Sequence, residues 1–315
     1  MLRKCDNHHA LMWGRRAVGR RMKNADTIFE RYEEVRARLP QTPKGQGTVE
    51  IASLLDIADQ VDAFVFDAFG VLNVGETLIE CADVRLDQLR ERGCQIRILT
   101  NAASYDRAHA VQKFKRLGVR VRDEEIITSR DAALANLPDL HWGVITADAD
   151  ALSDLDGPIT RLGDDPAPYD DVEGFLFLSS ADWTEPRQAI LSAAMDHQPR
   201  PLVIANPDLV APRDGGFSIE PGYYGHQICD RHPGQVRFYG KPFPEVYRLV
   251  ETSLPGISPS RIAMCGDTLH TDVLGAAAQG WRTVLVTQDG LFAGLDTDLF
   301  AERSALHADW KLKRI

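Results

Sequence analysis

The sequence is short of the features that mark secreted, zinc-binding or membrane proteins. Its five cysteines are odd in number and widely scattered, and no two of them have C-x-x-C spacing. This pattern indicates neither a disulfide framework nor a zinc site, so we expect a reducing, cytoplasmic location. No segment approaches the roughly 20 consecutive apolar residues that cross a bilayer, and we therefore expect no membrane partner.

The sequence also lacks an excess of positive charge. Its formal net charge of −10 argues against binding nucleic acid through general electrostatics, so any anion site must be local. The first 22 residues are an exception, with six basic residues against one acidic residue. We predict an N-terminal basic tail and an amphipathic helix over residues 1–44. The tail is expected to be disordered or to precede a start at Met22, with a transit peptide or a partner-binding segment as alternatives.

Strand and helix patterns alternate along most of the chain and predict the α/β class. Apolar runs such as residues 63–69 and 94–101 alternate with helical patterns that close on Gly93 and Gly118. Repeated units of this kind form a parallel sheet covered by helices on both faces. The predicted core consists of residues 45–129 plus 235–315.

A second unit interrupts this core. Residues 130–234 have strand patterns of their own, separated by acidic and proline-rich loops. They predict an inserted α/β cap domain, with a cleft at its junction with the core. Residues 40–48, which are rich in proline, glycine and small polar residues, predict a linker after the N-terminal helix.

Two aspartates are predicted at the carboxyl ends of neighbouring strands, where ligands bind in open α/β sheets. Asp67 ends the apolar run VDAFVFD, and Gly70 then allows a tight turn. Asp267 follows another apolar strand, and Asp272 stands five residues later, where a helix starts. A lone aspartate could equally cap a turn, so the prediction of a cation site depends on further residues.

Polar residues after other predicted strands complete the pattern. Thr100 and Asn101 can hydrogen-bond a phosphoryl oxygen, and Lys241 in a Gly-Lys-Pro turn can offset negative charge. Mg²⁺ prefers oxygen ligands, which Asp67, Asp267, a backbone carbonyl and a substrate phosphate would supply. With this metal, Asp67 can attack phosphorus and form an aspartyl-phosphate, which water then releases.

The ordered motifs D-x-x-G-V, L-T-N, G-K-P and G-D-T-x-x-T-D resemble those of the haloacid dehalogenase (HAD) superfamily. The resemblance extends over residues 49–292 and implies a HAD-like Rossmannoid core. It implies a role for each matched residue. Asp67 would be the nucleophile, Thr100 and Asn101 would contact the phosphate, and Lys241 would balance charge. Asp267 and the carbonyl of Phe69 would bind the metal, with Asp272 in a supporting role.

The predicted cap resembles that of the class IIA branch, which includes phosphatases of nitrophenyl phosphate, pyridoxal phosphate, phosphoglycolate and sugar phosphates. In that branch the cap closes over the active site and sets substrate choice. The cap candidates here are Asn206, Asp208, Tyr223, Tyr224 and His226. A turn-forming role is the alternative for Asn206 and Asp208. The expected partner is a small phosphorylated metabolite, and a homo-oligomer stays open.

One residue departs from the phosphatase pattern. Phosphatases of this superfamily carry an acid/base aspartate two residues after the nucleophile, where this chain has Phe69. Loss of a general acid/base typically costs about 10²–10⁴ in rate. Dehalogenase members carry an aromatic residue there but work without magnesium, whereas this chain keeps the acidic metal motif. Phosphonatase members need a cap lysine, and residues 129–234 contain none.

Two hypotheses therefore remain. The first is a phosphohydrolase in which the leaving group, water, His226 or His270 replaces the missing proton carrier. His270 is equally expected to face solvent from its loop. The second is a non-catalytic or very slow protein that binds a phosphate ligand.

Overall fold

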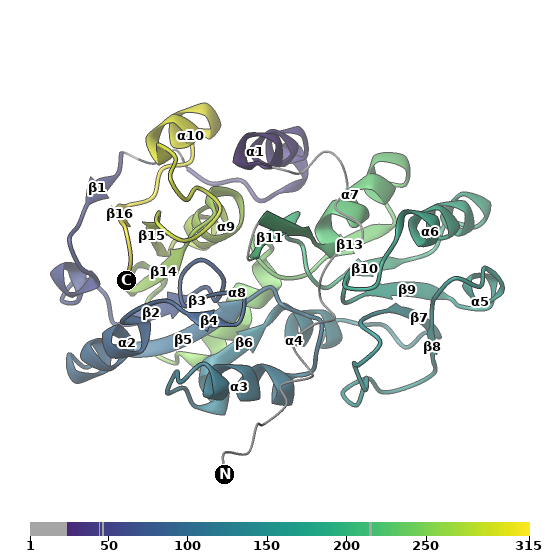
Figure 1. The fold of residues 1–315 in the computed structure, drawn as a ribbon, viewed down its shortest axis with the longest axis horizontal. Helices are drawn as coiled ribbons and strands as arrows, with labels where there is room; N and C mark the ends of the chain where they lie inside the picture. The colour runs from purple at the N-terminus through teal and green to yellow at the C-terminus, as the bar shows by residue number, and fades with distance from the viewer. Residues whose placement is uncertain (1–23, 44, 46, 214–215) are drawn as a thin grey trace, which may run out of the picture.

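The largest sheet of the molecule is parallel and has seven strands in the order β1-β16-β15-β14-β2-β5-β6. The computed structural model describes residues 24–43, 45, 47–213 and 216–315. The strands are β1 (Val49–Glu50), β2 (Ala63–Phe66), β5 (Gln95–Thr100), β6 (Ile126–Thr128), β14 (Ile262–Gly266), β15 (Arg282–Val286) and β16 (Trp310–Leu312). Helices lie on both sides of this sheet (Figure 1). The predicted α/β class is confirmed.

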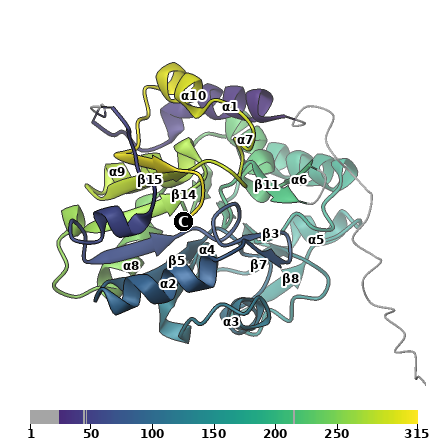
Figure 2. The ribbon, with the colours of Figure 1, turned by 60° about the vertical axis from the view of Figure 1, so that its left-hand side comes forward.

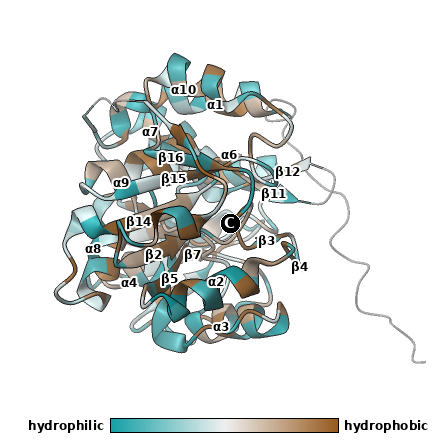
Figure 3. Ribbon diagram, turned by 90° about the vertical axis from the view of Figure 1, so that its left-hand side faces the viewer, coloured by the Kyte–Doolittle hydropathy of each residue, from teal (hydrophilic) through white to brown (hydrophobic). Residues whose placement is uncertain are grey.

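The central strand β2 is buried on both faces. Phe64 and Phe66 pack in one cluster with residues of α2 (Ala82–Glu91) and α3 (Arg107–Arg116). Ala63 and Val65 face the opposite way and pack with residues of α4 (Ser129–Leu134), α8 (Pro244–Ser253) and α9 (Leu274–Ala278). A strand covered on both faces forms from a continuous apolar run. Figure 3 shows this hydrophobic centre around β2, β5 and β14, with hydrophilic residues on the outer helices.

A second parallel sheet of five strands has the order β13-β10-β9-β7-β8 and lies beside the first (Figure 1). Its strands are β7 (Trp142–Ile145), β8 (Ile159–Arg161), β9 (Gly174–Phe177), β10 (Leu202–Ile204) and β13 (Val236–Phe238). Its helices are α5 (Ala167–Asp170), α6 (Glu185–His197) and α7 (Pro221–Arg231). Because β13 pairs with β10, this sheet extends past residue 234. The division into a core and a cap at 130–234 stays a prediction.

Two hairpins lie near the ends of the sheets. The first joins β3 (Asn73–Val74) to β4 (Thr77–Leu78), shortly after the end of β2. The second joins β11 (Val210–Arg213) to β12 (Gly216–Ile219), between β10 and α7. Both contribute residues to the cavity described below.

The N-terminal helix α1 (Ala25–Glu34) packs against both parts of the molecule. It runs beside α10 (Thr297–Ser304) in both views (Figures 1 and 2), where the Phe29 and Phe300 rings lie 5.2 Å apart. Arg31 of α1 forms a 2.9 Å ion pair with Asp230 of α7. The structure has a helix within the segment 1–44, whereas the predicted tail lies outside the described residues. No helix in the described part of the chain has the length and apolar character to span a membrane.

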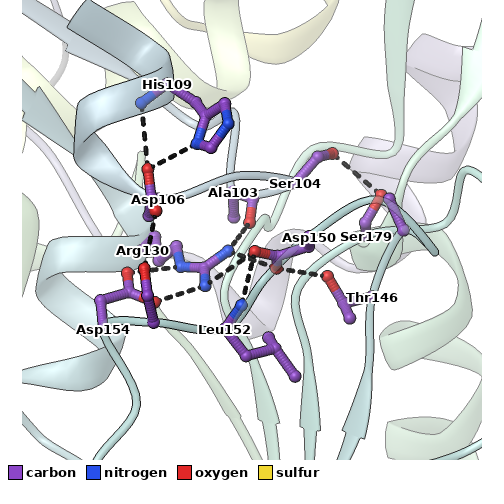
Figure 4. Close-up of polar contacts among 12 residues, drawn as sticks. Ala103, Ser104, Asp106, His109, Arg130, Thr146, Asp150, Leu152, Asp154 and Ser179 are labelled. Carbon is purple, nitrogen blue, oxygen red and sulfur yellow. Dashed lines mark hydrogen bonds and ion pairs between the residues drawn. The ribbon is translucent and has the colours of Figure 1, made fainter.

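A buried arginine ties α4 to the loop after β7 (Figure 4). Arg130 lies 2.7 Å from Asp150 and 2.6 Å from Asp154, and only 1% of its side chain is exposed. Its guanidinium also donates to the carbonyl of Ala103, which follows β5. The network therefore connects the carboxyl end of the large sheet to the beginning of the second sheet.

Candidate functional site

The carboxyl ends of three adjacent strands bring the predicted residues together. Asp67 follows β2, Asp267 follows β14, and Thr100 is the last residue of β5. These strands are neighbours in the order β14-β2-β5. The backbone N–H of Ala68 donates to Asp67 Oδ1 over 2.7 Å, and that of Leu291 donates to Asp267 Oδ2 over 2.7 Å. Both carboxylates are thus held in place by main-chain donors.

Lys241 lies between two of the acids. Its Nζ is 2.6 Å from Oδ1 of Asp67 and 2.7 Å from Oδ1 of Asp272, and 1% of the lysine side chain is exposed. Asp272 in turn accepts from the backbone N–H of Thr268 over 3.1 Å. The ammonium group of Lys241 therefore lies where it can offset the negative charge of both acids.

Three carboxylates converge on one point. Asp67, Asp267 and Asp272 each offer an oxygen within 4.8 Å of the others. Glycine permits this approach, because a Cβ atom at Gly290 would stand 2.1 Å from Asp267 Oδ2 and one at Gly70 would stand 2.8 Å from it. Any side chain at either position would collide with the acid.

Asp67 and Asp267 lie in a buried environment that disfavours the charged form of a carboxyl group. Burial raises the pKa of Asp67 to about 6, although the positive charge of Lys241 opposes the shift. Burial, followed by the negative charges of Asp67 and Asp272, raises the pKa of Asp267 to about 8. A divalent cation would favour the charged form of both groups.

Asn101, which follows β5, forms hydrogen bonds with Lys241 and with the loop between β10 and β11. Its Nδ2 donates to Asp208 Oδ1 over 2.8 Å and to the Lys241 carbonyl over 3.0 Å, while its Oδ1 accepts from the Lys241 N–H over 2.8 Å. Both amide hydrogens are therefore in use. The side chain therefore positions Lys241 and Asp208 relative to each other. The phosphate contact of Asn101 stays a prediction.

A cavity of about 980 Å³ opens in front of these residues. Asp67, Thr100 and Asp267 line it from the large sheet, and Asn206 and Asp208 line it from the loop after β10. Asn206 donates to Glu220 over 3.1 Å, and its Oδ1 accepts from the Asp208 N–H over 3.0 Å. Asn206 and Asp208 therefore line the cavity, and the hydrogen bond between them also fits the turn-forming role considered from the sequence.

Three predicted histidine and tyrosine roles need correction. Tyr224 lines the cavity, but Tyr223 and His226 are not among the described residues that do. His226 is buried, and its ring stacks on Phe238 at 4.4 Å because α7 packs that face against β13. His270 is fully buried, with its Nε2 at 2.5 Å from Glu33 Oε1. The expectation that His270 faces solvent is wrong, because α1 covers it, and neither histidine is placed to carry a proton to the cavity.

Sequence reasoning missed many of the residues that line the same cavity, among them Tyr32, Lys113 and Arg213. Tyr32 comes from α1 and stacks on His270 with ring centroids 4.9 Å apart. Its Oη accepts from the Leu209 N–H over 3.2 Å. Lys113 comes from α3 and Arg213 from β11, so only tertiary packing brings them to the site.

Comparisons with known proteins agree with this arrangement. Residues 64–146 match the family of haloacid dehalogenase-like hydrolases, and residues 238–308 match the related HAD-hydrolase-like family. The chain belongs to the HAD superfamily. It is 27% identical over 284 residues to phosphoglycolate phosphatase 1A, chloroplastic, of Arabidopsis thaliana, covering 78% of this chain and 74% of that protein. It is 28% identical over 254 residues to chronophin of Rattus norvegicus, covering 74% and 79%.

Solved HAD structures share the fold. A possible sugar phosphatase of the HAD superfamily from Cytophaga hutchinsonii superposes with a TM-score of 0.73 at 22% identity, covering 84% of this chain and 98% of that one. The 4-nitrophenylphosphatase of Thermotoga maritima gives 0.66 at 21% identity, covering 82% and 96%. The HAD-like fold with a cap is confirmed, and these relatives together place the chain in the class IIA branch of the superfamily.

Proposed function

We propose that this HAD hydrolase is a magnesium-dependent phosphohydrolase of small phosphate monoesters that works through an aspartyl-phosphate on Asp67. The observation that carries the proposal is the position of the Asp67 carboxylate. It faces a cavity of about 980 Å³, 2.6 Å from a buried lysine and within reach of two further acids. The phosphatases among its relatives support the same reaction class.

The residues fit a magnesium ion. Three carboxylates lie within 4.8 Å of one another, and glycines leave room around Asp267. Asp67, Asp267 and the carbonyl of Phe69 would hold the ion, with Asp272 in support. When bound, Mg²⁺ would reduce the repulsion between the Asp67 carboxylate and a phosphate dianion.

Asp67 is the nucleophile in this mechanism. One carboxylate oxygen forms a bond to phosphorus while the bond from phosphorus to the ester oxygen breaks, and the electron pair leaves on that oxygen. Thr100 Oγ1 accepts from the Ala102 N–H over 3.1 Å, so its own hydrogen is free to be donated to a phosphoryl oxygen. Water then attacks phosphorus in the aspartyl-phosphate, which restores Asp67 and releases phosphate.

Phe69 sets the leaving groups that this site handles best. A phenyl ring donates no proton, so the departing oxygen must leave as an anion or take its proton from water. Aryl and acyl phosphates have leaving groups that tolerate this. We therefore expect a steeper dependence of kcat on leaving-group acidity than in a phosphatase with an aspartate at this position.

The proposal is tested with nitrophenyl phosphate. We expect release of phosphate that requires Mg²⁺, is lost in EDTA and is lost in Asp67→Asn. Asp62→Asn is a matched control, because Asp62 lies at the opposite end of β2 in a surface pair with Arg261. No hydrolysis of any phosphate ester by the wild type would reject the proposal and favour a phosphate-binding protein, and so would activity that persists in Asp67→Asn.

The location proposed for this enzyme is the cytoplasm. Cys81, Cys94, Cys229 and Cys265 are free thiols, which supports a reducing compartment. Expression with a fluorescent tag would test this, and a signal confined to another compartment would reject it.

A further inference from the structure

Two cations approach the ring of Phe69. Lys113 Nζ lies 4.1 Å from the ring centroid, and the guanidinium carbon of Arg213 lies 4.9 Å from it. Lys113 belongs to α3 of the large-sheet unit, whereas Arg213 ends β11 beside the second sheet. The two therefore reach the same ring from different parts of the chain, and both line the cavity that contains Asp67.

Local acids balance these cations only in part. The carboxylate of Glu76 lies 3.5 Å from Lys113 Nζ, and 74% of its side chain is exposed. Arg213 lies 3.3 Å from Glu220, which also accepts from Ser218. The exposed pair of Glu76 with Lys113 contributes little energy, so Lys113 is the cation more open to a competing anion. Glu220, with 9% of its side chain exposed, is the firmer partner. The Lys113 side chain itself is only 20% exposed, so its charge acts with little screening by solvent.

We infer that Lys113 and Arg213 form a second anion site, which selects phosphate monoesters whose leaving group carries a carboxylate or a second phosphate. The inference rests on the proposed function, in which Asp67 takes the phosphoryl group. Phe69 stands two residues after Asp67, at the position from which HAD phosphatases serve the leaving group. A charge carried by that leaving group therefore lies on the side where the two cations stand.

The uncharged ring at position 69 is consistent with this site. An aspartate there would stand between Lys113 and Arg213, pair with both, and cancel the charge that an anionic substrate would meet. It would also repel that substrate. Phenylalanine does neither, and the two cations lie 4.1 Å and 4.9 Å from its ring centroid, distances at which the ring attracts a positive charge.

Matched substrate pairs test the inference. The first pair is phosphoglycolate and the analogue in which an amide replaces its carboxylate, and the second is 4-carboxyphenyl phosphate and 4-carbamoylphenyl phosphate. Within each pair the leaving groups differ mainly in one negative charge. We expect the wild type to prefer the charged member by about tenfold or more in kcat/KM, since hydrogen bonds between charged groups are stronger than those to a neutral amide. Comparing kcat/KM for a bisphosphate and for the corresponding monophosphate shows whether the site also accepts a second phosphate in place of the carboxylate.

Variants then assign the preference to the two cations. In Lys113→Met/Arg213→Met the ratio of the two kcat/KM values should fall close to one. Lys113→Arg keeps a cation and should keep the preference. Lys115→Met is the matched control, because Lys115 lies on the same helix with 60% of its side chain exposed and pairs with Asp123. A wild-type ratio near one, or a ratio unchanged in the double variant, would overturn the inference.

A binding experiment separates this inference from the proposed function. Calorimetry on Asp67→Asn with Mg²⁺ measures the affinity for phosphoglycolate and for its amide without turnover. We expect tighter binding of the charged compound, and loss of that difference when Lys113→Met/Arg213→Met is added. Equal affinities would reject the second anion site even if nitrophenyl phosphate is hydrolysed. A clear difference would support the site even if hydrolysis is absent.

Discussion

The Nζ atom of Lys241 lies 2.6 Å from Oδ1 of Asp67 in a place where only 1% of the lysine is exposed. Burial favours loss of the lysine proton, yet the carboxylates of Asp272, Asp67 and Asp208 outweigh burial and raise the pKa of Lys241. The ammonium group therefore stays charged at neutral pH. It is a fixed counter-charge for a nucleophile whose own pKa burial has already raised to about 6.

Replacing Lys241 with methionine should disable the enzyme and weaken the fold. The pKa of Asp67 would rise further, so that less of the nucleophilic carboxylate would be present at pH 7. We expect kcat for nitrophenyl phosphate to fall by about 10²-fold or more. Stability should fall by about 3–5 kcal/mol in urea unfolding, because two buried acids lose their partner. Lys115→Met serves as the control, and an unchanged kcat in Lys241→Met would contradict this role.

Replacing Phe69 with aspartate should restore a proton carrier and change substrate preference. We expect kcat for an alkyl phosphate such as ethyl phosphate to rise by about 10²-fold, with a much smaller gain for nitrophenyl phosphate, whose leaving group needs no proton. Preference for phosphoglycolate over its amide should fall, because the new carboxylate would pair with Lys113 and Arg213. Steady-state kinetics on these substrates measure both effects. Equal gains on both leaving groups would show that proton supply is not what Phe69 limits.

The sequence predicted the positions of Asp67 and Asp267 in the fold, because strand ends are local features. Asp67 and Asp267 each follow a continuous apolar run, and parallel strands deliver their carboxyl ends to one edge of the sheet. Thr100 was placed by the same argument. Residue types and spacing were therefore enough to predict these positions, because the strands that bear them are neighbours in the sheet.

The rest of the cavity depends on contacts between distant segments. Lys113 lies on a helix whose charged pattern indicates only a solvated face, and Arg213 lies in a hairpin whose position is set by tertiary packing. His270 was expected to face solvent because nothing in its loop shows that α1 covers it. Periodicity reports which side of an element is apolar, but it does not report which element packs there.

His226 should make the protein sensitive to acid. Burial, together with the positive charges of Arg38 and Arg31, lowers the pKa of His226 to about 3. An unfolded histidine titrates near 6.5, so between these values the unfolded chain binds a proton that the folded chain does not. Stability is therefore fully present above about pH 6.5 and falls as the pH decreases, by about 2 kcal/mol at pH 5 from this residue alone.

Urea unfolding at pH 7 and pH 5 measures this effect. His226→Gln removes the titrating group, so the loss of stability between the two pH values should be smaller by about 2 kcal/mol than in the wild type. His197→Gln, at the exposed end of α6, is the matched control. An equal pH dependence in the wild type and in His226→Gln would rule out His226 as the acid-sensitive group.

The buried network of Arg130 should stabilise the junction between the two sheets far more than a surface ion pair does. Arg130→Met would leave Asp150, whose side chain is 2% exposed, without its cation, and we expect a loss of about 3–5 kcal/mol. Arg187→Met removes a pair with Asp164, whose side chain is 77% exposed, and should cost at most about 1 kcal/mol. Arg130→Met/Asp150→Asn should regain much of the loss, because the neutral amide leaves no unpaired buried charge and its oxygen can still accept a hydrogen bond from Thr146 or Leu152. Urea unfolding of the three variants decides the matter, and similar losses for Arg130→Met and Arg187→Met would show that the buried network adds no more stability than a solvated pair.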